Sequence, residues 1–122
     1  MTKRVLGIFL VACVLIGLCA CGKEVSEYVR EHGQISLEII EDYLEGNISD
    51  DTAMTKLKVQ EDLIHDHCDQ VESDTGKFPY KDDMVALKIG SCWNAVFSHH
   101  LGSGSKQKIK DAANELKKAM NQ

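Results

Sequence analysis

Residues 81–101 decide the fold class, and they read KDDMVALKIGSCWNAVFSHHL. Apolar side chains recur in this stretch at intervals of three and four residues, which places them on one face of an α-helix. This face carries Val85, Ile89, Cys92 and Val96, with Trp93, Phe97 and Leu101 beside it. We therefore predict an amphipathic helix over residues 81–101 that packs its apolar face against the rest of the chain.

The same spacing recurs in three further segments, at residues 24–45, 50–73 and 105–120. The segments are separated by turn-forming sequences: Gly46-Asn47, residues 74–79 with the single proline of the chain, and Gly102-Ser103-Gly104-Ser105. Short connections place neighbouring helices antiparallel. The predicted fold is therefore all-α, a small antiparallel bundle of about four helices.

The N-terminal segment has a different pattern. Lys3 and Arg4 precede an apolar run of 14 residues, Val5 to Leu18, and the run ends in Leu18-Cys19-Ala20-Cys21. A basic head, an apolar centre and a small residue before the cleavage point are typical of a secretory signal. The last four residues resemble the lipobox of bacterial lipoproteins, although Cys19 stands where small or hydroxylated residues are more usual.

This resemblance implies that residues 1–20 form a cleaved signal peptide and that residues 21–122 form the mature helical domain. Cys21 would become the first mature residue and carry a diacylglyceryl (palmitate-type) thioether. Two acyl chains give stable anchoring, so we expect the protein on the extracytoplasmic face of a bacterial cell membrane. The alternatives are an uncleaved anchor, which is short for a span of about 20 residues, or a plain secreted protein.

The charge of the mature chain is uneven. Its net charge is −7, with −11 over residues 23–74 and +4 over residues 75–122. Such asymmetry is typical of a bipolar interaction surface, or of solvated helix faces that attract each other within one bundle. The acidic balance argues against nucleic acid as a partner, because phosphate binding needs clustered lysine and arginine.

Two of the five cysteines, Cys68 and Cys92, remain after the signal peptide and Cys21 are set aside. Both fall on apolar helix faces, and an oxidising compartment permits a disulfide between them. Counting from the loop at residues 74–80 leaves them offset by about a turn and a half of helix. The alternative is two buried free thiols that behave as small hydrophobic residues.

The histidines could suggest a metal site, but their spacing does not support one. His65 and His67 are two residues apart and His99 and His100 are adjacent, whereas zinc ligands on a helix are typically four residues apart. If Cys68 meets Cys92, the same register places Glu61 opposite His99. We therefore formulate the hypothesis that Glu61 pairs with His99 or His100; the alternative is that Glu61 reaches water at the edge of its helix face.

No acid, base and nucleophile converge in the sequence, so we expect a protein that is not an enzyme and that uses no cofactor. The favoured function is a binding or interaction module for an unknown protein or small molecule. Any groove is expected to involve Trp93 and Phe97 with Tyr28 and Tyr43, although such residues more often belong to the core. The alternative is a metal- or redox-responsive ligand carrier that uses histidines or the Cys68 and Cys92 pair.

Overall fold

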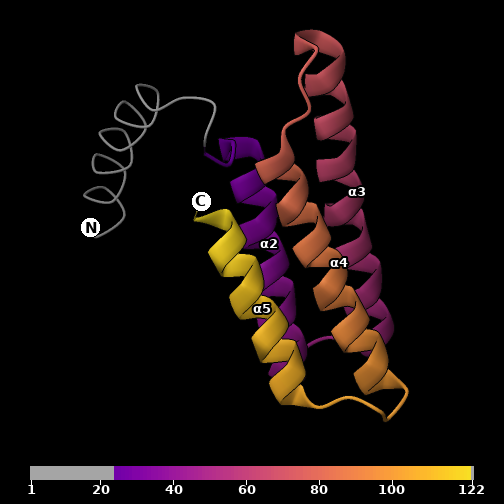
Figure 1. Cartoon of the computed structure of the whole chain (residues 1–122). Helices are drawn as coiled ribbons and strands as arrows, with labels where there is room; N and C mark the ends of the chain where they lie inside the picture. Colours follow the sequence, from indigo (N-terminus) through magenta and orange to yellow (C-terminus); the bar gives the residue numbers. More distant parts are fainter. Residues whose placement is uncertain (1–23, 122) are drawn as a thin grey trace, which may run out of the picture.

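The computed structural model describes residues 24–121, and over this range it contains four helices and no strand. They are α2 (Glu27–Leu44), α3 (Asp50–Thr75), α4 (Tyr80–His100) and α5 (Lys106–Met120). Successive helices run in opposite directions side by side (Figure 1). The predicted all-α antiparallel bundle is therefore confirmed. The predicted signal peptide and Cys21 lie outside the described residues.

Serine side chains set the start of three helices. Ser26, Ser49 and Ser105 each accept a hydrogen bond from the backbone N–H three residues later, which satisfies one of the unpaired donors of the first turn. The sequence predicted that the first helix begins at residue 24. The cap at Ser26 explains why α2 begins at Glu27 instead. At the other end of α3, Gly76 adopts a left-handed conformation with φ of 74°, and the helix ends there.

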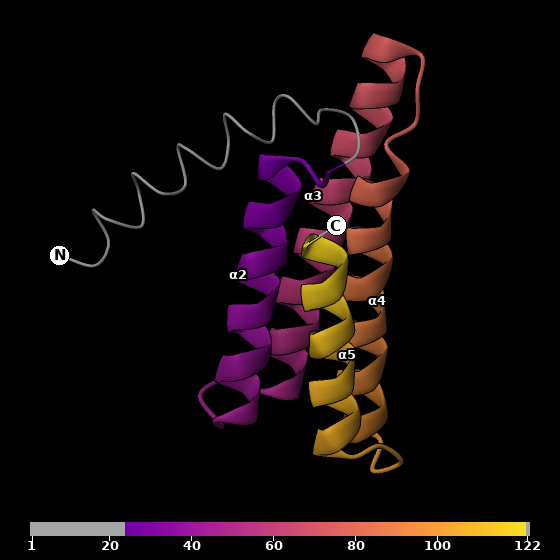
Figure 2. The ribbon, with the colours of Figure 1, turned by 60° about the vertical axis from the view of Figure 1, so that its left-hand side comes forward.

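The core is a column of aliphatic side chains along the bundle axis. The large side chains that are essentially inaccessible to solvent are Ile40, Leu57, Ile64, Ile89, Ile109, Leu116, Val29, Val85 and Val96. Helices α2 and α4 contact each other across the bundle, while α5 contacts α2 and α4 but not α3. Thus α3 and α5 lie on opposite sides of the α2 and α4 pair, as Figure 2 shows.

Two hydrogen bonds define the end of the bundle at which the described chain begins. The Ser26 backbone N–H donates to Asp82 Oδ1 at 2.8 Å, and Arg30 Nε donates to the Met120 carbonyl oxygen at 3.1 Å. The starts of α2 and α4 and the end of α5 therefore meet here; we call this the N-terminal end of the bundle. The turns at residues 45–49 and 101–105 form the opposite end.

None of the helices over residues 24–121 is both long enough and apolar enough to cross a membrane.

Candidate functional site

A groove with a volume of about 760 Å³ lies between α2 and α5. This volume is within the range of small-molecule sites in proteins. Its apolar lining consists of Leu37, Ile40, Leu44, Ala113 and Met120. We call this feature the α2–α5 groove.

The two walls of the α2–α5 groove carry opposite charges. Lys106, Lys110 and Lys117 line it from α5, and Glu41 of α2 and Glu45, directly after α2, line it from the other side. Within residues 24–121, no ion pair joins these two walls. The lysine ammonium groups of the groove are therefore available to an anionic group of a ligand, above an apolar floor.

A glycine and a methionine close the groove towards the N-terminal end of the bundle. A Cβ atom at Gly33 would lie 2.8 Å from Met120 Sδ, so the absence of a side chain at Gly33 allows Met120 to pack directly on α2. Arg30 holds the Met120 carbonyl by the hydrogen bond described above. Met120 therefore packs against α2 at this part of the groove lining.

The predicted aromatic groove is wrong, because the structure separates its four residues. Trp93 and Phe97 stack on each other with ring centroids 5.2 Å apart, and Tyr43 is buried against His99. Tyr28 stacks on His67 with a centroid distance of 4.6 Å. None of the four lines the α2–α5 groove. One sequence signal pointed to the real groove: lysines at positions 106, 110 and 117 recur on one face of α5.

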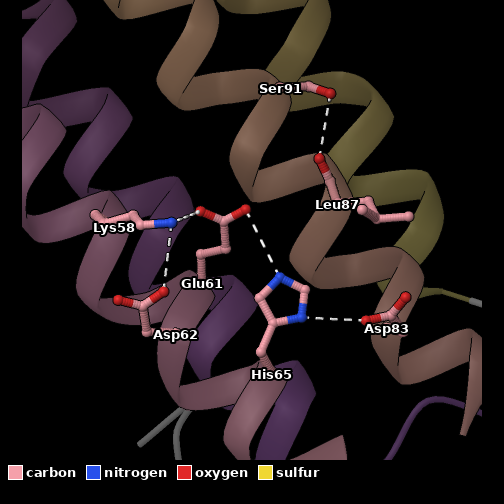
Figure 3. A network of polar contacts seen from close by, with 7 residues as sticks. All are labelled: Lys58, Glu61, Asp62, His65, Asp83, Leu87 and Ser91. Atoms are coloured by element: carbon pink, nitrogen blue, oxygen red, sulfur yellow. Dashed lines mark hydrogen bonds and ion pairs between the residues drawn. The ribbon is translucent and has the colours of Figure 1, made fainter. Parts of the chain in front are cut away.

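Three histidines join α3 to α4 through carboxylates. His65 Nδ1 lies 3.2 Å from Asp83 Oδ1, His67 Nε2 lies 3.5 Å from Asp82 Oδ2, and His100 Nδ1 lies 2.8 Å from Asp50 Oδ2. Figure 3 shows His65 between Glu61 of its own helix and Asp83 of α4. The histidines thus pair across one interface and do not converge on a single point.

The predicted pair of Glu61 with His99 or His100 is wrong. Glu61 contacts Lys58 and His65, at 3.1 and 3.8 Å, while His99 Nδ1 lies 2.7 Å from the Tyr43 hydroxyl. Glu61 Oε2 lies over Gly90, where a Cβ atom would approach it to 2.7 Å. The missing side chain at Gly90 therefore provides the space that Glu61 occupies between α3 and α4.

The register of α3 and α4 explains this error. Residues 50, 61, 65 and 67 of α3 lie level with residues 100, 90, 83 and 82 of α4. Helix α3 extends past the start of α4, and the connection at residues 76–79 runs back along its last turns (Figure 1). The loop therefore does not mark the point where the two helices face each other.

The same register separates the two cysteines, and both are free thiols in the structure. Cys68 lies level with about residue 82, ten positions before Cys92, which corresponds to about 15 Å along the helix axis. A disulfide needs Cα atoms within about 7 Å of each other. Cys68 and Cys92 therefore do not form a disulfide. Burial raises the pKa of each thiol to about 12, with a further contribution from Asp82 at Cys68.

A second polar cluster lies at the opposite end of the bundle, where Tyr43, Asp50, His99 and His100 meet. Hydrogen bonds from Tyr43 and His100 lower the pKa of Asp50, and the hydrogen bond to Asp50 raises the pKa of His100. Burial, supported by Asp50, raises the pKa of Tyr43 to about 12. Tyr43 therefore stays protonated at neutral pH, and the Asp50 and His100 pair favours its charged form.

We expect His100→Gln to lower the melting temperature at pH 5.5 and to have little effect at pH 8.5. A raised histidine pKa contributes stability below the unfolded value of about 6.5, and this contribution is lost as the pH rises through the folded-state pKa. The effect is small because the side chains of His100 and Asp50 are both partly exposed to solvent, which screens their interaction. Thermal melts of both proteins at the two pH values measure it, with Lys108→Gln as the control. An equal difference at both pH values would contradict the pairing.

Over residues 24–121, no group of three or more histidine, cysteine, aspartate or glutamate side chains is arranged to hold a metal ion. No protein-family model matches the chain, and neither a curated protein sequence nor a solved structure is significantly similar to it.

Proposed function

We propose that this protein is a small extracytoplasmic lipoprotein, tethered to a membrane by a diacylglyceryl group on Cys21, that binds an amphipathic ligand in the α2–α5 groove. The tether rests on the lipobox-like sequence at residues 18–21. The binding function rests on one observation, the groove itself, with its apolar floor and its three lysines.

The apolar residues of the α2–α5 groove and its lysines together define the kind of ligand that it can bind. The partly buried Leu37, Leu44 and Ala113 offer an apolar surface, which favours a hydrocarbon or aromatic group. The lysine ammonium groups favour a carboxylate, sulfonate or phosphate at the edge of the same ligand. An anionic amphiphile satisfies both requirements, whereas a purely polar ligand would leave the floor in contact with water.

The probe 8-anilino-1-naphthalenesulfonate tests the groove, because its fluorescence increases when its rings leave water. We expect Lys110→Gln/Lys117→Gln to weaken its binding by about twofold to thirtyfold, from about 0.2–1 kcal/mol for each of the two exposed charge pairs. Fluorescence titration gives the dissociation constants.

The matched control is Lys108→Gln/Lys118→Gln, which removes the same charge from the same helix outside the groove. We expect this variant to bind like the wild type. A third variant, Ala113→Phe, places a ring on the groove floor and should also weaken binding. Equal affinities for both lysine variants, together with unchanged binding by Ala113→Phe, would refute the groove as the binding site.

A further inference from the structure

We propose that the exposed face at the start of α4 is a second membrane contact, which lies on the bilayer that holds the lipid of Cys21. This inference rests on the tether of the proposed function and adds a protein surface to it. The surface consists of Tyr80, Met84 and Leu87, which we call the α4 stripe.

The α4 stripe is apolar and open to solvent. Tyr80, Met84 and Leu87 are 77%, 42% and 51% exposed, and their spacing of four and three residues places them on one face of α4. The opposite face of the same turns is buried in the core through Val85 and Ile89. The side chains of the stripe therefore contribute little to the packing of the core. They are in contact with water unless another surface covers them.

Chain geometry places the proposed lipid near this stripe. Ser26 is five positions after Cys21, so the two Cα atoms are at most about 18 Å apart. The Ser26 backbone donates to Asp82, which belongs to the same first turn of α4 as Tyr80 but is buried on the face opposite to the stripe. A lipid on Cys21 therefore keeps the N-terminal end of the bundle, which includes the first turn of α4, within reach of the bilayer surface.

The charges around the stripe indicate an apolar contact and not one driven by anionic lipid. Lys77, Lys81 and Lys88 are close in sequence to the stripe. They are offset by Asp83, which lies beside the stripe on α4 and pairs with His65, and by Glu72 and Asp74 near the end of α3. Three apolar side chains alone bind a membrane weakly. The tether makes such a weak contact effective, because it keeps the local concentration of bilayer high.

Depth-dependent quenching tests the contact in the full-length, lipid-anchored protein on neutral phosphatidylcholine vesicles. A fluorophore is attached to Leu87→Cys, and in a second protein to Ser103→Cys at the opposite end of the bundle. Cys68 and Cys92 stay unlabelled because both are fully buried and their pKa is about 12. We expect nitroxide-bearing lipids to quench the Leu87→Cys fluorophore several-fold more than the Ser103→Cys fluorophore. We expect Tyr80→Ser/Met84→Ser to reduce this quenching.

Each other outcome overturns a defined statement. If the protein floats with the vesicles but both fluorophores are quenched equally, the stripe does not contact the membrane. The lipid tether is still supported in that case. A Leu87→Cys fluorophore that is shielded from water but not quenched by the lipids shows that protein and not lipid covers the stripe, which also refutes membrane contact. Protein that does not float with the vesicles refutes the tether and the stripe together, while the titration of the α2–α5 groove is unaffected.

Discussion

Replacing Cys21 by serine is expected to abolish incorporation of labelled fatty acid into the protein, whereas replacing Cys19 by serine leaves it intact. A thioether needs a thiol, and the lipobox resemblance assigns that role to Cys21 alone. The change is all-or-none, because serine at position 21 offers no sulfur atom for the thioether and the diacylglyceryl group cannot be attached. Metabolic labelling followed by gel electrophoresis measures it.

Mass spectrometry of the purified protein supplies the second readout. We expect the wild-type N-terminus at Cys21, with the added mass of a diacylglyceryl group. The Cys19→Ser variant is the matched control, since it changes a cysteine two residues away and leaves Ala20-Cys21 in place. Label that persists in Cys21→Ser, or a mature N-terminus elsewhere, would remove the tether from the proposed function.

The largest expected loss of stability follows from truncating the centre of the core, through Ile89→Ala. Ile89 is fully buried on α4, and deleting its outer carbons leaves a cavity that costs about 2–5 kcal/mol. For a domain of this size, about 1 kcal/mol corresponds to about 4–8 °C in melting temperature. We therefore expect a decrease of about 10 °C or more, measured by thermal or urea denaturation.

Leu87→Ala is the control for this loss of stability. It truncates an aliphatic side chain two positions earlier on the same helix, but Leu87 is 51% exposed. The expected change for such a surface position is within about 0.5 kcal/mol. Equal destabilisation by the two substitutions would show that the face assignment of α4 is wrong.

The sequence predicted the helices because their signals are local. The apolar spacing of residues 85, 89, 92 and 96 and the turn residues between segments depend only on neighbours in the chain. The predicted boundaries differ from the observed ones by three residues at most, and the largest difference arises at the cap formed by Ser26. Cys21 and the signal peptide remain predictions from sequence.

The contacts between helices were harder to predict, because they depend on the axial position of each helix relative to its neighbours. The expected pairs, Cys68 with Cys92 and Glu61 with His99, needed an uneven loop that shifts α4 by about a turn and a half relative to a symmetric arrangement. The observed loop shifts the register in the opposite direction. The connection runs back along α3, which shifts the register so that Glu61 lies over Gly90. A helix pattern defines the buried face, but it carries no information on axial position.

The sequence alone therefore determined the fold class, the helix limits and the buried faces, because each follows from periodicity and capping within a segment. Tertiary structure decided which residues of different helices meet: the histidine and carboxylate pairs, the two separate thiols and the α2–α5 groove. The physical reason is that axial register and crossing geometry are set by side-chain packing between helices, where Gly33 and Gly90 create close approaches that no local pattern encodes.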